Sequence, residues 1–513
     1  MPLYPLTLSV LLTTTAIAAL MGWRYWNEQQ RYRALATLPS PPKQPLLGNI
    51  PDILNAVQQK RFFQLLWDWS KQYGSMYVYW VGRNPVLILG QPKLIETIII
   101  TGMRDGQLIR SDIARRAWND ISGPILLGLE GDEWKWRRKA WNPEFTVTGV
   151  ARYNNMVGQA CQLVSHRIHQ APQGKPVEVD PLFVELTMRV IAFLLLGIPL
   201  DPQQPTPEGP PLAVQEIYQA MSVIAYRFLR VATGEKTWQK YLPTQASRDY
   251  WDAKKTLEKF LLPRAELALK LRDGEITAAE SGVSDLFQNS MLVKVIAKEP
   301  RYSQGDLLAE MIELLIAGTD TTAHSLSFAA GELASHPAIF QKAQGLVDHV
   351  YAKYGTLSSV ESLTELTYIR AIFKETLRLY SIASGSTSLQ VVSPLAIADV
   401  VIPVGTKIFW SMQAAGRDPE TYPNPDEFQP ERWLEEEKGS PSLPLIDFGS
   451  GAHRCLGEHL AMLEATVMLA ELLRQFDWEL VNGRASLENL QQNLLIYPPD
   501  GMPLRFTPRK IAV

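Results

Sequence analysis

The sequence predicts a mainly helical fold with a minor β part, an α+β fold, and three observations support this class. Long stretches with a 3.6-residue hydrophobic period fill most of the chain, strand-like segments are few, and no internal repeat is present. Hydrophobic residues make up 46% and charged residues 20%, which is a globular composition. The 513 residues allow one large domain or two fused lobes.

Composition and charge exclude several classes of function. The chain carries 50 basic and 53 acidic side chains, a net charge of −3, so its overall charge does not favour nucleic acid as a partner. Its two cysteines, Cys161 and Cys455, form no Cys-x-x-Cys pair, which disfavours a zinc site or a disulfide framework and fits a reducing compartment. Cys161 lies among apolar helical positions and is expected in the core.

The amino terminus predicts a membrane anchor. Residues 3–23 carry no charge and reach the length of about 20 residues that a helix needs to cross a bilayer. Arg24, Arg31 and Arg33 follow, so the body is expected on the cytoplasmic side of the endoplasmic reticulum in a eukaryote or of the inner membrane in a bacterium. A signal peptide cleaved near Ala18 is the alternative, but the usual positive segment is missing. We expect an anchor over residues 1–23, a basic and proline-rich linker over 24–46, and a catalytic domain over 47–513.

Strand and helix signals follow in order along the body. Residues 78–81 and 86–89 flank a Gly82-Arg83-Asn84-Pro85 turn and predict a β-hairpin. The hydrophobic period predicts long helices at residues 150–169, 214–231, 251–271, 307–335, 339–354, 365–380 and 458–476. Strand-like pieces return at residues 400–408 and 494–506, which predicts the minor sheet.

A cysteine between glycines gives the strongest local signal. It lies in Phe448-Gly449-Ser450-Gly451-Ala452-His453-Arg454-Cys455-Leu456-Gly457, where the glycines let the backbone approach a flat ligand. The sulfur of Cys455 would lie at the start of a helix, where the helix dipole and free N–H groups favour a thiolate ligand. From the residues alone, a small buried cysteine is an equal alternative.

This decapeptide resembles the haem-binding loop Phe-x-x-Gly-x-(Arg/His)-x-Cys-x-Gly of the cytochrome P-450 family. The resemblance implies the cytochrome P-450 fold, a large helical lobe with a small β-rich lobe. It also implies a non-covalent haem b (iron-protoporphyrin IX) with Cys455 as the iron ligand, in a loop formed with Phe448, Gly451, His453 and Gly457. Members that attach haem covalently have a glutamate where this chain has Ala317, so covalent attachment is not expected.

A threonine-rich segment, Ala317-Gly318-Thr319-Asp320-Thr321-Thr322, lies inside the longest predicted helix. The hydroxyl of Thr321 is expected to bond back to the carbonyl of Ala317 and to bend the helix. Taken alone, such a kink is more often structural. The segment also resembles the family pattern (Ala/Gly)-Gly-x-(Asp/Glu)-Thr-(Thr/Ser), which implies that Asp320 and Thr321 are catalytic and deliver protons during oxygen activation.

Glu375 and Arg378 stand three residues apart on a predicted helix and can form an ion pair. Taken alone, the pair is most simply a surface salt bridge. Arg432 follows within Pro430-Glu431-Arg432-Trp433, and cytochromes P-450 join such an arginine to the Glu-x-x-Arg pair in a buried cluster. The resemblance therefore implies a structural role for Glu375, Arg378 and Arg432.

Trp134 and Arg138 resemble the Trp-x-x-x-Arg helix that holds a haem propionate in the family. Lys135, Arg137 and Lys139 are expected to point elsewhere. They form either a solvated basic face or a docking surface for an acidic electron donor, and the sequence leaves both open.

The chain departs from the family after the Glu-x-x-Arg helix. Many members carry prolines and a propionate-binding arginine there, whereas residues 381–392 contain neither. Gln390 is the candidate substitute, as a neutral donor.

The resemblance implies a monooxygenase that inserts one oxygen atom from O₂ into a lipophilic small molecule. No flavin or nicotinamide module is visible, so electrons are expected from a separate NADPH-dependent reductase or ferredoxin. The alternatives are a haem-thiolate isomerase or dehydratase acting on a hydroperoxide, and a haem sensor without turnover. Neither needs an acid–alcohol pair, so Asp320 and Thr321 argue against both.

Overall fold

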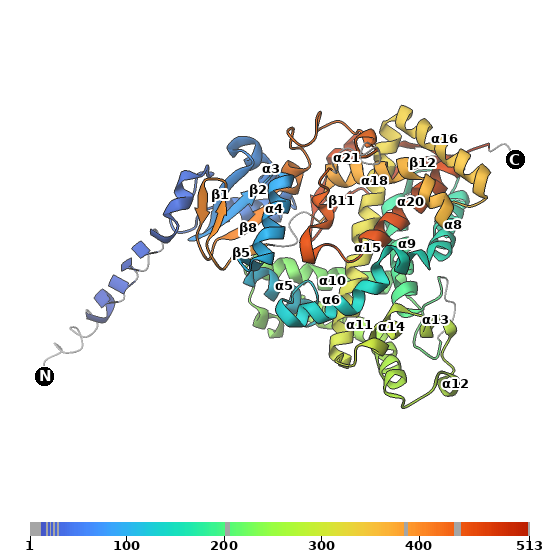
Figure 1. The fold of residues 1–513 in the computed structure, drawn as a ribbon, viewed down its shortest axis with the longest axis horizontal. Coiled ribbons are helices and arrows are strands. Elements are labelled where there is room, and N and C mark those ends of the chain that lie inside the picture. The colour runs from blue at the N-terminus through green and yellow to red at the C-terminus, as the bar shows by residue number, and fades with distance from the viewer. Residues whose placement is uncertain are drawn as a thin grey trace.

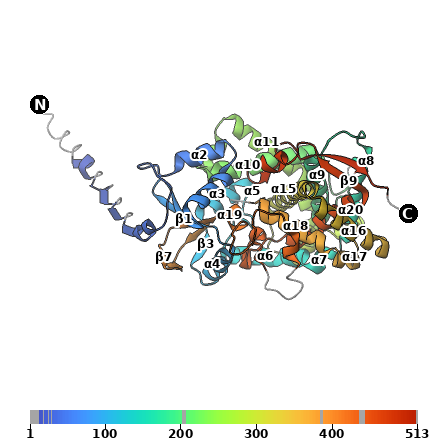
Figure 2. The same cartoon turned by 90° about the horizontal axis from the view of Figure 1, so that it is seen from above.

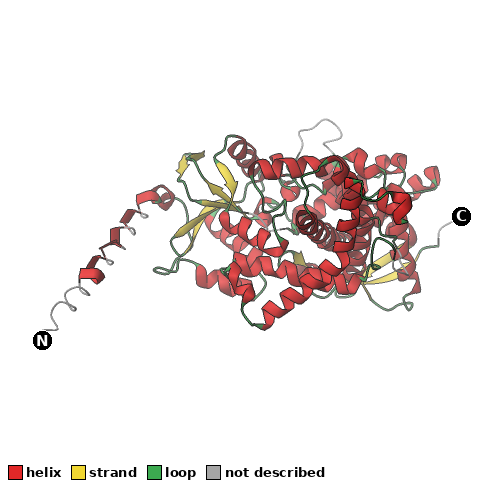
Figure 3. Cartoon of the chain, turned by 90° about the horizontal axis from the view of Figure 1, so that it is seen from below, coloured by secondary structure: helices red, strands yellow, loops and turns green. Residues whose placement is uncertain are grey.

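The computed structural model describes residues 12–16, 19–20, 22–23, 26–27, 30–200, 206–383, 388–434 and 443–510. Helices fill most of this part of the chain, and the larger share of the strands gathers on the amino-terminal side of the molecule (Figure 1, Figure 3). The mainly helical α+β class predicted from the sequence is confirmed.

The α-helices range from single turns to the 32 residues of α15. They are α2 (Ile50–Gln58), α3 (Phe62–Tyr73), α4 (Pro92–Arg104), α5 (Asp112–Ser122), α6 (Gly131–Phe145), α7 (Val147–Ala151), α8 (Asn154–Gln170), α9 (Val179–Leu196), α10 (Val214–Ala232), α11 (Gln245–Asp273), α12 (Ala278–Ser281), α13 (Asp285–Gln288), α14 (Met291–Lys298), α15 (Gln304–Ser335), α16 (Pro337–Tyr354), α17 (Val360–Glu365), α18 (Thr367–Tyr380), α19 (Met412–Ala415), α20 (Glu458–Gln475) and α21 (Ala485–Glu488).

The central helix is α15, and Figure 2 shows it nearly end-on with other helices around it. Its first turn forms a capping box, because Ser303 accepts from the N–H of Asp306 and the Asp306 carboxylate accepts from the N–H of Ser303. From residue 307 to residue 333 every side chain is buried except four, which are Ala317, Gly318, Asp320 and Thr321. These four residues form one open turn in an otherwise buried helix.

The strands form one larger sheet and several small ones. They are β1 (Met76–Val81), β2 (Asn84–Leu89), β3 (Leu108–Arg110), β4 (Val177–Glu178), β5 (Leu389–Val391), β6 (Leu395–Ile397), β7 (Val400–Ile402), β8 (Lys407–Trp410), β9 (Phe476–Leu480), β10 (Gln491–Gln492), β11 (Ile496–Tyr497) and β12 (Pro503–Pro508). The five-stranded sheet has the order β1-β2-β8-β5-β3, with β2 and β8 parallel. A three-stranded sheet has the order β4-β12-β9, and β6-β7 and β10-β11 are two-stranded.

Most of the predicted elements are confirmed. Strands β1 and β2 form the predicted hairpin, with Val81 opposite Asn84. Helices α10, α11, α15, α16 and α20 include nearly all of the residues predicted for them. Two predicted helices are divided instead: the prediction over 150–169 covers the end of α7 and most of α8, and the prediction over 365–380 begins at the last residue of α17 and continues into α18.

The predicted membrane anchor over residues 1–23 lies mostly outside the described residues. Among the helices that the structure describes, none has the length and apolar character to cross a membrane. The anchor and the domain boundaries at residues 23 and 46 stay predictions.

A buried ion cluster fastens α6 to the start of α15. Arg137 donates from Nη1 to Glu310 at 3.0 Å and from Nη2 to Asp306 at 2.7 Å. The side chains of Trp141 and Tyr302 also donate to the Glu310 carboxylate, Tyr302 at 2.7 Å. Arg137 is 2% exposed and Glu310 is fully buried, so this pair is shielded from solvent.

The expectation that Arg137 points to solvent is therefore wrong, while Lys135 and Lys139 are exposed. The reason is helical geometry: Trp134, Arg137 and Trp141 have the spacing i, i+3 and i+7, which places them on one face of α6. All three are buried.

The ion cluster predicts a large loss of stability for Glu310→Ala. This change leaves Arg137 buried without its main counter-ion, so the free energy of unfolding should fall by about 3 kcal/mol. Glu133 also pairs with Arg137 but is 49% exposed, and Glu133→Ala should cost at most about 1 kcal/mol. Urea unfolding of the full chain followed by circular dichroism measures both losses. Equal losses for the two variants would contradict the interpretation.

Candidate functional site

The loop that carries Cys455 is built from two short 3-10 turns. These are η5 (Ile446–Phe448) and η6 (Gly451–His453). Gly449 and Gly451 have φ values of 71° and 66°, in the left-handed region that favours glycine. The backbone N–H of Cys455 donates to the carbonyl of Phe448 at 2.7 Å and closes the loop. The glycines are therefore required by the shape of this loop.

Cys455 lies just before α20, for which Gly457 is the N-cap residue. Cys455 is exposed, although neighbouring protein groups partly desolvate its sulfur. Desolvation raises the pKa of Cys455, while the N–H of Gly457 and the charges of Arg138 and Arg454 oppose this rise. The predicted position at the amino end of a helix is thus observed. Cys161 is buried, as predicted.

Trp134 and Arg138 of α6 both contact the cysteine loop. The indole of Trp134 stacks on the imidazole of His453, with ring centroids 3.9 Å apart. Nη2 of Arg138 donates to the carbonyl of Arg454 at 2.7 Å. Burial lowers the pKa of His453, and the positive charges of Arg110 and Arg138 lower it further, to about 3. Its imidazole is therefore neutral at pH 7.

Basic groups with unused donors gather around Arg110, beside this loop. Burial lowers the pKa of Arg110, and the nearby charges of Arg138 and Arg115 lower it further. Within the described chain, Nε of Arg115, Nε of Arg138 and Nδ1 of His453 are buried without a hydrogen-bond partner. Buried polar groups normally have partners, so this cluster is suited to an anionic ligand.

These residues fit the haem that the sequence predicts. A haem needs a soft ligand for its iron and donors for two propionate carboxylates, and the site offers an exposed thiol beside half-buried basic side chains whose buried nitrogens have no partner among the described residues. Arg110 and Arg115 were missed by the sequence analysis because they belong to no recognised motif. Gln390 lies opposite Ile109 in the sheet, and its role as a propionate donor stays a prediction.

The open turn of α15 carries the predicted acid and alcohol. The hydroxyl of Thr321 donates to the carbonyl of Ala317 at 2.7 Å, as predicted. Oδ1 of Asp320 is buried and has no hydrogen-bond partner among the described residues. Burial raises the pKa of Asp320, while His324 and a hydrogen bond from Tyr218 of α10 oppose the rise. The predicted bend of the helix stays a prediction.

The predicted cluster of Glu375, Arg378 and Arg432 is present and buried. Arg378 donates to both carboxylate oxygens of Glu375, at 2.9 Å and 2.8 Å, and Arg432 donates to Oε1 at 3.0 Å. Trp433 Nε1 and the backbone N–H of Gln429 complete the contacts, at 2.9 Å and 2.8 Å. The exposure of the three charged side chains is 0%, 0% and 7%, which excludes a surface salt bridge.

Glu313, one turn before Ala317 on α15, is a buried acid that the sequence analysis missed. Its carboxylate accepts from the backbone N–H groups of Leu126 and Leu127, both at 2.8 Å. Burial and the charge of Glu310 raise its pKa to about 8, although the two N–H groups and the charge of Arg110 act to lower it. Glu313 thus ties the segment between α5 and α6 to the central helix.

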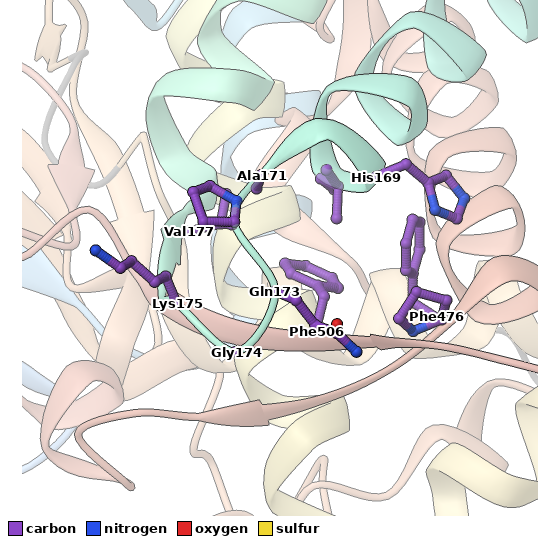
Figure 4. A pocket seen from close by; sticks show the side chains of 11 residues that line it. His169, Ala171, Gln173, Gly174, Lys175, Val177, Phe476 and Phe506 are labelled. Carbon is purple, nitrogen blue, oxygen red and sulfur yellow. The ribbon is translucent and has the colours of Figure 1, made fainter.

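A separate surface pocket lies between the end of α8 and strands β9 and β12 (Figure 4). His169, Lys175, Phe476 and Phe506 are among its lining residues. None of the predicted site residues lines it, so we assign it no part in the chemistry.

Comparison with known proteins gives one consistent result. A family model described as Cytochrome P450 matches residues 38–506. The chain is 26% identical to cytochrome P450 cyp-13B1 of Caenorhabditis elegans, over 91% of this chain and 93% of that protein. It is 25% identical to cytochrome P450 3A12 of Canis lupus familiaris, over 93% and 92% of the two chains. Identity to cytochrome P450 3A6 of Oryctolagus cuniculus is also 25%, over 92% of each chain.

The buried carboxyl of Glu313 predicts a pH-dependent stability. Because folding raises its pKa from 4.5 to about 8, its contribution is fully present below pH 4.5 and is lost as the pH rises to about 8. Glu313→Gln keeps an acceptor for the two N–H groups but cannot ionise. As the pH is raised from about 5 to about 9, the melting temperature of the variant should therefore fall less than that of the wild type.

The matched control is Glu488→Gln, at a glutamate whose side chain is 71% exposed. This variant should follow the wild-type curve. Parallel curves for Glu313→Gln and the wild type would show that Glu313 does not change its protonation on folding.

Proposed function

Because this chain belongs to the cytochrome P450 family of monooxygenases, we propose that it inserts one oxygen atom from O₂ into a lipophilic organic substrate as a haem-thiolate enzyme. The observation that carries the proposal is the exposed thiol of Cys455 in a glycine-shaped loop before α20, beside half-buried basic side chains with buried, unpartnered nitrogens among the described residues.

The residues of this loop and of α6 would hold a non-covalent haem b. Cys455 would ligate the iron, while Arg138, Arg115 and His453 would donate to the propionates from nitrogens that have no protein partner among the described residues. When bound, a haem with a thiolate ligand supplies the activation of O₂ and favours cleavage of its O–O bond. Trp134 would orient His453 by stacking.

Asp320 and Thr321 would deliver protons to the reaction. Burial raises the pKa of Asp320, and its Oδ1, which has no partner among the described residues, can accept and release a proton. The hydroxyl of Thr321 is the adjacent polar group on the same open turn. It would pass the proton into the substrate site by rotating away from the carbonyl of Ala317.

Electrons would come from a separate protein, a reductase or a ferredoxin. Lys135 and Lys139 are exposed on α6, next to the residues that contact the cysteine loop, and their charge would attract an acidic partner. We also propose that residues 1–23 anchor the protein in a membrane, with the catalytic domain over residues 47–513 on the cytoplasmic side.

Two alternatives are a haem-thiolate isomerase or dehydratase and a non-catalytic haem sensor. Both use a cysteine ligand, so Cys455 does not separate them from a monooxygenase. The acid–alcohol pair of Asp320 and Thr321 favours the monooxygenase, because neither alternative needs external protons to activate O₂.

The ligand role of Cys455 predicts a specific optical change. Reduction under carbon monoxide should give the red-shifted difference band that is typical of a thiolate-ligated haem, and Cys455→Ser should lose this band because a hydroxyl is a much poorer ligand. Cys161→Ala should keep it. An unchanged spectrum for Cys455→Ser would refute thiolate ligation by this residue.

The proton-delivery role predicts uncoupling in Thr321→Ala. With NADPH, ferredoxin and ferredoxin reductase as electron donors and 7-ethoxycoumarin as a lipophilic probe, the product formed per NADPH should fall about tenfold, and hydrogen peroxide should be released instead. Thr319→Ala is the control, because the Thr319 hydroxyl is buried against Leu315 on another face of the helix. Unaltered product yield in Thr321→Ala would contradict the monooxygenase mechanism.

A further inference from the structure

A buried polar cluster lies next to Asp320, between α15 and the first turn of α9. Nδ1 of His324 lies 2.8 Å from Oδ1 of Asp180, and the hydroxyl of Ser327 donates to the same oxygen at 2.7 Å. His324 and Asp180 are 6% and 8% exposed, and Ser327 is fully buried. Burying an ionisable pair this deeply costs folding free energy. The Glu375 cluster already anchors the structure elsewhere, so we ask what else this pair can do.

The cluster is placed to act on Asp320. His324 follows Asp320 by four residues, so the two side chains lie on the same face of α15, one helical turn apart. The bond to Asp180 occupies Nδ1 and leaves Nε2 as the second site for a proton. Oδ1 of Asp320 has no partner among the residues that the structure describes.

The charges around His324 favour its protonated form. Burial alone lowers the pKa of His324, but the carboxylate of Asp180, its hydrogen bond and the charge of Asp320 together raise it to about 8. The other titratable groups nearby are Tyr218, which hydrogen-bonds Asp320, and Tyr497 of β11, whose ring centroid is 6.1 Å from that of His324. The two aspartates, Asp180 and Asp320, are the groups whose charge acts on His324.

We propose that His324 supplies protons to Asp320, with Asp180 and Ser327 holding its ring in position. This inference rests on the proposed monooxygenase function, because only that reaction consumes protons at Asp320. His324 acts through Asp320 and is a proton-supplying residue that does not contact the reacting atoms.

The transfer balances at each atom. The N–H bond at Nε2 of His324 breaks and an O–H bond forms at Oδ1 of Asp320, directly or through one water molecule. The neutral imidazole keeps its proton on Nδ1, toward Asp180, and then regains a proton at Nε2 from solvent water. Asp320 returns to its carboxylate form when it passes the proton to Thr321.

A purely structural role is the alternative, in which His324 only ties α15 to α9. The variant His324→Asn separates the two roles, because an Asn amide N–H occupies a position similar to Nδ1 and still donates to Asp180 but cannot transfer a proton. The proposal predicts that His324→Asn keeps the carbon monoxide spectrum and loses coupling with 7-ethoxycoumarin by about tenfold. Wild-type coupling should fall as the pH rises above about 8, and this pH-dependent fall should be absent in the variant.

His336→Asn is the matched control, since His336 pairs with Glu332 and caps the far end of the same helix. It should leave both the coupling and its pH dependence unchanged. Wild-type coupling and pH dependence in His324→Asn would overturn the proposal.

A second measurement does not depend on turnover. Histidine C2 hydrogen–deuterium exchange, followed by mass spectrometry of the holoenzyme, reports a titration midpoint for each histidine. The midpoint of His324 should lie above 6.5 in the wild type and fall in Asp180→Asn. A wild-type midpoint at or below 6.5 would overturn the proposal even if His324→Asn failed to fold.

The two proposals fail in different ways. Loss of coupling in Thr321→Ala together with normal coupling in His324→Asn would reject only the role of His324. Normal coupling in Thr321→Ala would reject the monooxygenase mechanism itself, and the proton supply with it.

Discussion

The position of the cysteine loop depends on the buried carboxylate of Glu375. Burying a carboxylate costs several kcal/mol unless donors replace its water. Here Arg378, Arg432, Trp433 and the backbone N–H of Gln429 replace it, all at 3.0 Å or less. Arg378 also donates to three backbone carbonyls between residues 416 and 427. The segment that leads to the cysteine loop is thereby fixed to α18, and removing any one donor leaves the buried carboxylate of Glu375 incompletely hydrogen-bonded.

A second set of contacts joins α6, α15 and the segment between α5 and α6. The Arg137–Glu310 pair joins α6 to α15, and Glu313 joins α15 to the segment that precedes α6. Arg138, next to Arg137, then contacts the cysteine loop through the carbonyl of Arg454. Helix α6 thus contacts both the cysteine loop and α15, about two turns before the open turn, and so links the position of the thiol to that of the open turn.

The sequence predicted the parts of the site that recur as short motifs, because a loop, a turn or a helical spacing determines them locally. The cysteine loop and the Glu375 cluster are examples. It did not predict Arg115, Glu313 or His324, whose environment is made by segments distant in the chain. Helix α9 was missed for a related reason: it is buried on nearly all sides, so it lacks the apolar stripe that reveals a surface helix.

The acidic groups along α15 show how the scaffold becomes a reactive site. Glu310 accepts from three side chains and Glu313 from two backbone N–H groups. Asp320 lies on the open turn and is only partly buried, but its Oδ1 is buried without a partner among the described residues. The hydrogen bonds of Glu310 and Glu313 fix these two carboxyl groups in the scaffold, whereas an oxygen without a partner is free to accept and release a proton. Along this one helix, Glu310 and Glu313 therefore hold the structure together, and Asp320 is the acid available for proton transfer.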